Sequence, residues 1–404
     1  MKLKTWIVFI IPFSLMFHGY AQQGIVLYDS LIKDVVPYAH IYSSNGSFAT
    51  VSNDAGQFEL PDENNSFDTL LVSHVAYLRK ILLRDSLSRL DTLFVTQNST
   101  VLDEVVVFSE EAEVLIEDIM NLLKNATLLS GEAFYRQIST KNGVAMEWIE
   151  TFYDLSYSEN GVHGISIDQA RFARKKYSQE YVFISHTNFS ILTVGTQLFV
   201  PKDPTNRMRA GKPFNESFTN DYDFTISNVF SKDGDMLVEV NYKPNTEIAL
   251  PVHSFGNFIY NQTQGKMVQY NATINHALGA DQISYDGDRD VKMANPIHRF
   301  QVDFSEQTGK IEFIRVVFTY DLIEDEVVYP SRVTSSFVIY KKSEKPHKNL
   351  DVPTLMSEQV GNFETAKYKP KFWQDNPIIK RTLEEEAIIS SFEKDNAFGT
   401  YFKK

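Results

Sequence analysis

Residues 49–62 have the sequence ATVSNDAGQFELPD, and the way this stretch folds decides how the front of the chain is built. Asn53 and Asp54 carry oxygen atoms that could bind a cation, with Gly56 in the turn. The same residues suit the tip of a β-hairpin, because Asn and Asp tolerate left-handed backbone and glycine adopts positive φ freely. The flanking apolar residues favour strands. We therefore predict a structural hairpin at Asn53, Asp54 and Gly56, and no metal site.

The residues around this stretch form short apolar runs separated by turn residues at intervals of about 8–12 residues, a pattern typical of a small β-sandwich. Asn45-Gly46 is one such turn, since Asn-Gly accepts positive φ at little cost. The predicted strands are 24–27, 36–42, 48–51, 57–60, 68–73, 79–83, 90–95 and 103–108.

Five of these segments carry short motifs in a fixed order, which are GIV at 24–26, PYAHI at 37–41, TVSNDAGQFEL at 50–60, LVSHVAY at 71–77 and LDEVVV at 102–107. Together they resemble the carboxypeptidase-regulatory-like domain of exported proteins of the Bacteroidetes. The resemblance implies a seven-stranded, transthyretin-like sandwich over residues 22–108. It also implies a binding or scaffolding module without peptidase activity. One departure is Ala76, where the family has glycine before the tyrosine.

The first residues form a secretory signal. Lys2 and Lys4 precede the mostly apolar run 5–17, and Gly19 and Ala21 provide the small residues of a cleavage site. Residues 1–21 are therefore predicted to be a signal peptide. An uncleaved anchor is the alternative, but the apolar run is shorter than the roughly 20 residues that span a bilayer. We expect an exported protein, periplasmic or associated with the outer membrane, with no transmembrane segment after cleavage.

Composition excludes several classes of function. The 404 residues have a net charge of −13 and no basic run longer than residues 174–176, so a nucleic-acid partner is not expected. Cysteine is absent, which excludes disulfides and thiolate catalysis.

The rest of the chain is predicted to be a connecting helix at 109–130 and a large antiparallel β-domain at 131–345. Apolar residues recur at three- and four-residue steps in the first segment, whereas long alternating strands follow in the second. The Asp233-Gly234 pair predicts a hairpin turn. The strand pattern also resembles two-domain exported proteins of the same bacteria, which suggests a half-barrel like that of lipoprotein carriers.

Residues 346–404 are predicted to be a linker and a helical tail. Thr382 and Glu385 have the spacing of a capping box, which places a helix start at this point. Phe372 and Trp373 are expected to dock the tail on the β-domain. The predicted apolar face of the helix consists of Leu383, Ala387, Ile388 and Phe392.

The familiar catalytic motifs are not present. The histidines never have the spacing of a zinc peptidase, and no Gly-x-Ser-x-Gly or phosphate-binding glycine loop occurs. Asp286, Asp288 and Asp290 alternate on a loop, but Val291 and Ile297 occupy the positions where a calcium loop needs glycine and glutamate. We therefore predict no metal and no cofactor.

Aromatic residues give one candidate binding surface. Tyr153, Tyr157, Tyr177 and Tyr181 could line a groove for a sugar or a lipid, although cross-strand packing is the commoner use of such residues. The sequence as a whole predicts a non-enzymatic cell-envelope protein with a binding or docking module and a second ligand-binding domain. The expected partner is an envelope protein, a glycan or an apolar ligand.

The alternative is a hydrolase that acts on glycans or peptides through carboxylates of the second domain. Glu147, Glu150 and Asp154 are the candidates. Strand alternation places Glu150 and Asp154 on one face and Glu147 on the other.

Overall fold

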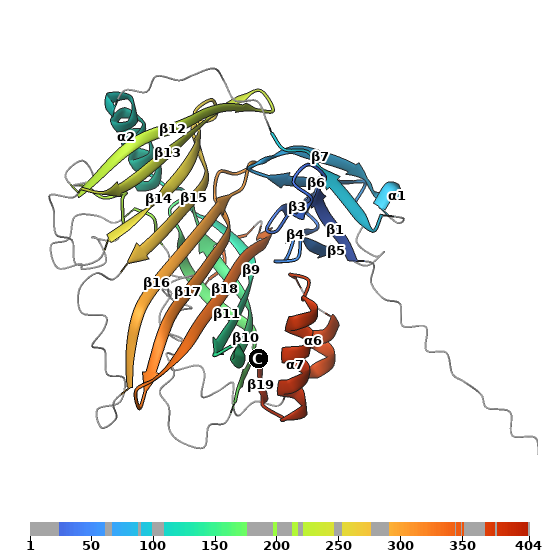
Figure 1. Ribbon diagram of the computed structural model, residues 1–404. Coiled ribbons are helices and arrows are strands. Elements are labelled where there is room, and N and C mark those ends of the chain that lie inside the picture. Colours follow the sequence, from blue (N-terminus) through green and yellow to red (C-terminus); the bar gives the residue numbers. More distant parts are fainter. Residues whose placement is uncertain are drawn as a thin grey trace, which may run out of the picture.

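The computed structural model describes residues 24–60, 67–87, 90–98, 109–175, 197–199, 212–216, 221–245, 253–275, 291–343, 345–348, 350, 368–375 and 378–402. The chain is mainly β, as predicted. A small two-sheet unit near the N-terminus lies against a much larger sheet, with helices on both sides of that sheet (Figure 1).

The small unit, residues 24–98, consists of two four-stranded sheets that enclose a common apolar core. Ile25 and Leu93 from one sheet pack with Ile41 and Val72 from the other. This arrangement confirms the predicted sandwich, although its described part has eight strands where the family resemblance predicts seven, and the strand predicted at 103–108 lies outside the described residues. In the first sheet β1 (Gly24–Asp29) pairs with β2 (Asp34–Val35), β5 (Gln57–Glu59) and β8 (Thr92–Val95). The second has the order β4 (Ala49–Val51), β3 (His40–Ser43), β6 (Thr69–His74) and β7 (Tyr77–Leu83), followed by α1 (Arg84–Leu87).

The predicted hairpin at residues 53–56 is wrong in its pairing, although the tight turn is present. Asn53 and Gln57 are joined by a backbone hydrogen bond of 2.9 Å, and Gly56 has φ +68°. The flanking strands, however, belong to different sheets, since β4 pairs with β3 and β5 pairs with β1. The turn therefore carries the chain across the sandwich. Turn residues alone do not reveal which sheet the next strand will join.

Substituting Gly56 by alanine is expected to lower the stability of the sandwich by about 2–3 kcal/mol. A Cβ at this position would lie 2.8 Å from the Leu27 carbonyl oxygen and 3.0 Å from the Val35 Cβ, in a backbone conformation that disfavours side chains. Gly46 is the matched control, because its φ is +71° and a Cβ there meets nothing within 4 Å. Chemical denaturation of both variants tests this, and equal losses at the two positions would contradict the role of close packing.

The large unit is an eleven-stranded antiparallel sheet within the described residues. Strands β12 to β18 follow one another in the sheet, and β18 then pairs with β9, the first strand of the unit. The sheet therefore joins its last long strand to its first one. The Asp233-Gly234 hairpin turn is confirmed. In spatial order the strands are β12 (Tyr222–Lys232), β13 (Asp235–Pro244), β14 (His253–Asn261), β15 (Lys266–Asn275), β16 (Val291–Phe304), β17 (Ile311–Glu324), β18 (Val327–Ser343), β9 (Leu129–Lys141), β10 (Val144–Tyr157), β11 (Val162–Arg174) and β19 (Phe398–Phe402).

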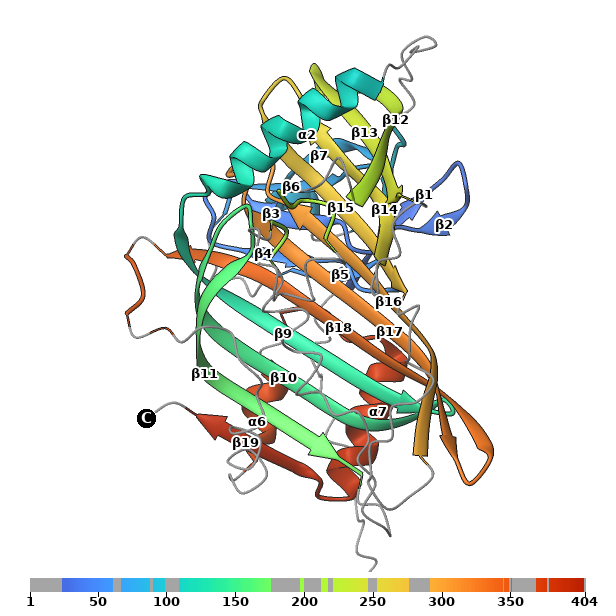
Figure 2. The same ribbon diagram turned by 90° about the vertical axis from the view of Figure 1, so that its left-hand side faces the viewer.

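The sheet is curved, and helix α2 (Ser109–Lys124) lies across its hollow side (Figure 2). Leu115, Ile119 and Leu123 of this helix, which contacts β12 and β15, are buried in the same apolar cluster as Ile149 and Tyr153 of β10. The predicted amphipathic connecting helix is thus present. Its packing closes the largest apolar core of the protein. None of the helices in the described part of the chain is long and apolar enough to cross a membrane.

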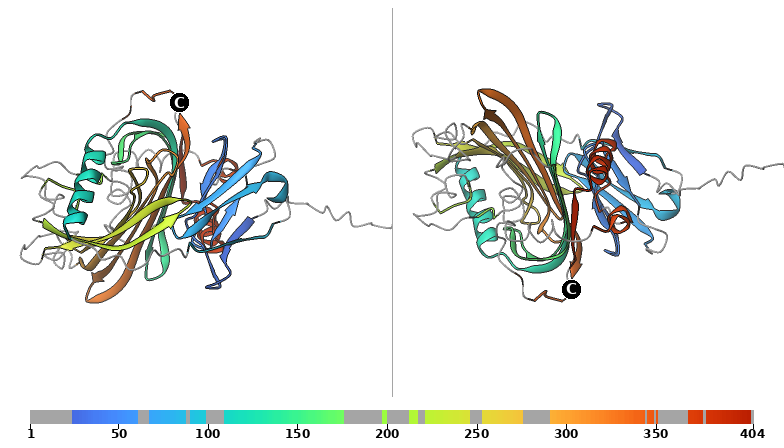
Figure 3. Two further views of the ribbon diagram at one scale, coloured as in Figure 1. Left: turned by 90° about the horizontal axis from the view of Figure 1, so that it is seen from above. Right: turned by 90° about the horizontal axis from the view of Figure 1, so that it is seen from below.

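The outer side of the sheet carries both the sandwich and the C-terminal helices (Figure 3). These helices are α6 (Pro370–Asp375) and α7 (Leu383–Lys394), and the capping box of Thr382 and Glu385 is present as predicted. Trp373 packs on Phe152 of β10, with ring centroids 5.7 Å apart, which confirms the predicted docking of the tail. The predicted helix face needs correction, because Leu383 is 89% exposed, Ala387 is exposed and Ile389 is buried instead, whereas Phe392 is buried as predicted. The first turn of α7 contacts the sheet through Glu385, which forms an ion pair with Arg136 of β9 at 3.3 Å, and not through Leu383.

Candidate functional site: a polar groove and the interface beside it

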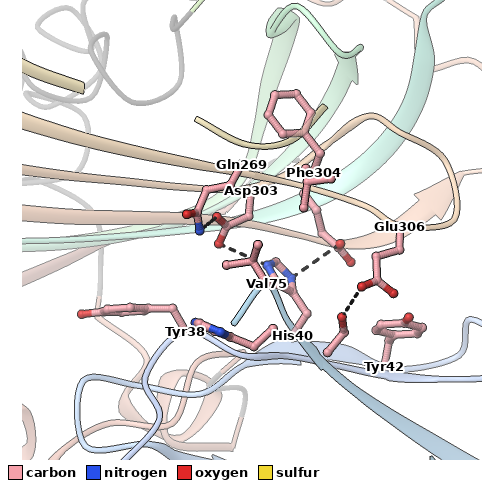
Figure 4. A pocket seen from close by; sticks show the side chains of 12 residues that line it. Tyr38, His40, Tyr42, Val75, Gln269, Asp303, Phe304 and Glu306 are labelled. Atoms are coloured by element: carbon pink, nitrogen blue, oxygen red, sulfur yellow. Dashed lines mark hydrogen bonds and ion pairs between the residues drawn. The ribbon is translucent and has the colours of Figure 1, made fainter. Parts of the chain in front are cut away.

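The sandwich meets the large sheet through a buried polar cluster centred on His40 (Figure 4). His40 projects from β3 towards carboxylates of β16 and β17. Its Nε2 lies 3.4 Å from Asp303 and its Nδ1 lies 3.5 Å from Glu312. The carboxylate of Asp303 also accepts a hydrogen bond of 2.9 Å from Gln269. His40 thus lies between two acidic groups of the other unit.

A second polar cluster, centred on the carboxylate of Glu306, extends this interface. Glu306 follows β16 and accepts hydrogen bonds from Ser73 at 2.6 Å and from Lys232 at 2.9 Å. It also forms an ion pair with Arg79 of β7. Burial raises the pKa of Glu306, but the Lys232 charge and these hydrogen bonds outweigh burial and lower it to about 2. Glu306 is therefore an anion that links both sheet systems at neutral pH.

The apolar side of the interface lies next to these charges. Tyr38 stacks on Phe313 of β17, with centroids 5.7 Å apart, and the Arg315 guanidinium lies 4.5 Å from the Tyr38 ring. Val51 is buried in the same cluster. The cavity left beside His40 measures only about 30 Å³, which is room for roughly one or two water molecules. The interface is closely packed and is not itself a ligand pocket.

The turn at residues 53–56 also contacts the large unit. Asp54 forms an ion pair with Arg315 of β17 at 3.1 Å, and the Asn53 side-chain amide donates to the Lys380 carbonyl at 3.2 Å. Lys380 forms an ion pair with Glu59 in return. The residues first considered for a cation thus join the sandwich to the sheet and to the C-terminal segment.

A groove of about 930 Å³ opens at the place where these three parts meet. The turn forms one wall through Asp54, Ala55 and Gln57, and the first turn of α7 forms another. The floor is the outer face of the large sheet. It consists of Ile138 and Thr140 on β9, Thr319 and Asp321 on β17, and Arg332, Thr334 and Ser336 on β18.

Polar side chains recur on this floor, beside apolar groups such as Ile138 and Pro330 and, from the α7 wall, Leu383 and Ile388. Arg332 donates from Nε to the Thr334 hydroxyl at 3.2 Å, and Asp321 accepts from the Asn295 amide at 2.8 Å. The groove volume lies within the range of about 300–1,000 Å³ that small-molecule sites occupy. Hydroxyl groups both donate and accept hydrogen bonds, whereas guanidinium only donates and carboxylate only accepts. The floor can therefore bind a ligand that carries many hydroxyl groups.

The predicted tyrosine groove is only partly within the described residues. Tyr153 and Tyr157 lie on β10 in the core beneath α2, and burial raises the pKa of both phenols, to about 12 for Tyr157. Tyr177 and Tyr181 lie outside the described residues. The four tyrosines as a ligand site stay a prediction. The three aspartates at 286–290 also lie outside the described residues.

The carboxylates of the hydrolase alternative are held in ion pairs. Glu150 is fully buried between Arg136 of β9 and Arg171 of β11, its direct neighbours across both adjacent strands. Arg381 lies 3.6 Å away. Burial raises the pKa of Glu150, but the charges of Arg171, Arg381 and Arg136 outweigh burial and hold it well below its usual range.

The other two carboxylates are also paired. Glu147 accepts a hydrogen bond of 2.6 Å from Arg174, and Asp154 lies 3.8 Å from His347. Ile149 and Tyr153 belong to the apolar cluster on the hollow side of the sheet, whereas Phe152 packs on Trp373 of the tail. Alternation along β10 therefore places Glu147 and Glu150 on opposite faces, as predicted. Among the described residues, no three His, Asp or Glu side chains are arranged to hold a metal ion.

Comparisons with known proteins give little. Neither a scan of protein-family models nor a search of curated proteins finds a match. Among solved structures, a LolA superfamily protein from Nitrosomonas europaea is similar, with 9% identical residues and a TM-score of 0.18. The match covers 58% of this chain and 94% of that protein. At this TM-score the likeness indicates nothing about what the present chain binds.

Proposed function

We propose that this chain is a non-enzymatic, exported binding protein of the cell envelope, and that it binds an oligosaccharide in the groove between sandwich, sheet and α7. The observation that carries the proposal is the groove itself, with a volume of about 930 Å³ and a floor of hydroxyl, amide and charged side chains. Export and the envelope location rest on the predicted signal peptide at residues 1–21.

An oligosaccharide suits this floor better than an apolar ligand does. Thr140 of β9 and Thr319 of β17 lie on either side of Arg332 of β18, whereas Ser336 lies four residues further along β18. The floor therefore offers hydroxyl groups both across the strands and along them. A lipid covering them would remove water from these groups without replacing its hydrogen bonds, which is costly. Arg332 and Asp321 provide directed bonds at the Pro330 end of β18. The groove therefore favours a hydrophilic chain over a fatty acid.

A binding role without catalysis is supported by the state of the candidate acids. Glu150 is surrounded by three arginines, so it neither carries a transferable proton near neutral pH nor touches the groove solvent. The sandwich would serve as a docking module, as its resemblance to the carboxypeptidase-regulatory-like domain implies. Its contacts with the sheet hold it as one wall of the groove.

Binding can be measured by titration calorimetry with three probes, namely neutral oligosaccharides, short peptides and a fatty acid. We expect an oligosaccharide to bind and the Arg332→Ala and Thr334→Val variants to weaken that binding about tenfold each, the loss expected from one hydrogen bond of about 1.4 kcal/mol. Lys243→Ala is the matched control, because Lys243 is exposed on β13 and does not line the groove. Fatty-acid binding that these variants leave unchanged would overturn the proposal.

A further inference from the structure

The buried histidine at the sandwich–sheet interface has no role in the groove. His40 comes from the sandwich, whereas its two acidic neighbours, Asp303 and Glu312, come from the large sheet. The side chains of all three are at most 18% exposed. Figure 4 shows the imidazole directed across the interface towards Asp303. Both ring nitrogens can donate to carboxylates only when the ring is protonated.

Carboxylates outnumber the other cations around His40, which favours a protonated imidazole. Asp303, Glu306 and Glu312 face Lys232 and Arg79, and Arg79 also lies 3.9 Å from Asp233. Without the proton on His40, Asp303 and Glu312 flank a neutral ring, and the repulsion between these little-exposed carboxylates is strong. The titratable and charged groups that surround His40 are Asp303 on β16, Glu306 after β16, Glu312 on β17, Lys232 on β12, Arg79 on β7 and His74 on β6.

We propose that a proton held on His40 joins the sandwich to the large sheet, and that loss of this proton at alkaline pH loosens the interface. This pH dependence is separate from ligand binding and does not depend on which ligand the groove binds. It would still affect the groove, because Asp54 and Gln57 of the sandwich form one of its walls. Movement of the sandwich would open that wall.

The direction of the pH dependence follows from the raised pKa. Burial lowers the pKa of His40, but the charges of Glu312 and Asp303 outweigh burial and raise it from 6.5 to about 8. A group with a raised pKa contributes stability that is complete below the unfolded value and is lost as the pH rises through the folded value. The loss is therefore expected to begin above about pH 6.5, and it is complete about one unit above pH 8.

Other groups at the interface titrate outside this window. Burial lowers the pKa of His74 to about 4 and raises that of Tyr42 to about 12. Burial also raises the pKa of Glu312, and the charge of His40 opposes that rise. The variants below therefore include one at each of these two residues.

The absence of cysteine from the sequence allows a clean distance measurement. Fluorophores on Lys33→Cys in the sandwich and Lys243→Cys on β13, both exposed positions, would report energy transfer between the two units. We expect constant transfer at and below pH 6.5 and a change with a midpoint between pH 7 and pH 8. The titration of the His40 ring by NMR should have the same midpoint.

Substitutions test whether titration of His40, and not of another group, causes the change in energy transfer. His40→Gln should show no transition between pH 6.5 and pH 9, and Glu312→Gln should shift the midpoint to lower pH and reduce the change. His163→Gln is the matched control, since His163 is a half-buried histidine of β11 that bonds Ser158 away from this interface. Should His40→Gln fail to fold, Glu312→Gln still tests the coupling. The proposal would be overturned by energy transfer that stays constant up to pH 9 in the labelled protein with His40 and Glu312 intact. A transition that persists in His40→Gln would overturn it as well.

Discussion

Replacing Trp373 by alanine is expected to cost about 3–5 kcal/mol of stability, the usual loss for a buried aromatic side chain. Trp373 is 1% exposed and packs between Phe152 of β10 and Phe372, with centroids 5.7 Å and 5.1 Å from its own. The Arg171 guanidinium lies 5.2 Å from its ring. The truncation would leave a cavity between the tail and the sheet, and it would expose the buried charges beneath.

Urea denaturation followed by far-ultraviolet circular dichroism measures this loss. Leu383→Ala is the matched control, because Leu383 belongs to the same tail but is 89% exposed, so its truncation should change stability by less than about 0.5 kcal/mol. A loss below about 1 kcal/mol in Trp373→Ala would mean that the tail does not depend on this residue.

Local features of the fold follow well from the sequence. The capping box at Thr382 depends only on Glu385, three residues away, and the hairpin at Asp233-Gly234 depends only on backbone preferences at the turn. Alternation along β10 also separates Glu147 from Glu150 correctly. In each case the residues that decide the structure are neighbours in the chain.

The pairing of strands is a different matter. The turn at Gly56 needs positive φ whether the next strand pairs with its predecessor or crosses to the other sheet. The sheet that β5 joins is decided by its pairing with β1, about thirty residues earlier in the chain. The identity of the turn residues does not indicate this pairing. Likewise Leu383 matches the period of an apolar helix face, yet the first turn of α7 contacts β9 through Glu385 and leaves Leu383 in solvent.

The candidate site lies almost wholly beyond what spacing can predict. His40 and Asp303 are separated by 263 residues, and each looks like an ordinary surface residue in its own strand. The groove floor consists of Thr and Ser on outward-facing positions of strands, which is also the pattern of a solvated sheet. Only the positions of the turn and of α7 convert that face into a groove. One signal was available, since the polar residues that alternate along β18 at Arg332, Thr334 and Ser336 mark a face that apolar packing does not use.

Replacing Glu150 by glutamine is expected to cost about 3–5 kcal/mol, because it removes the buried carboxylate that pairs with Arg171. Arg136 and Arg381 would keep only their second partners, Glu385 and Glu386. Glu150 is 0% exposed, and its two oxygens bind Arg136 at 2.9 Å and Arg171 at 2.7 Å. Arg381 lies close by and loses the same partner. Glutamine keeps the shape of the side chain but offers only one acceptor oxygen and no charge.

Glu147→Gln is the matched control on the same strand. Glu147 is 1% exposed, but the side chain of its partner Arg174 is 38% exposed and can turn to water when the pair is broken. We therefore expect a smaller loss for Glu147→Gln, and equal losses would show that stranded arginines are not the cause. A double variant, Glu150→Leu with Arg171→Met, should recover part of the stability, since removing both members of a buried pair costs less than removing one.

This expected loss also decides how activity measurements on Glu150 must be judged. A hydrolase that used Glu150 would lose turnover in Glu150→Gln while the remaining stability stayed close to that of Glu147→Gln. A structural Glu150 would lose stability first, and any apparent activity would fall only with the folded fraction. Because the three arginines hold its pKa low, the stabilising effect of Glu150 is complete above its ordinary pKa of 4.5 and is lost progressively as the pH falls below that value. Turnover and denaturation measured on the same samples separate the two roles.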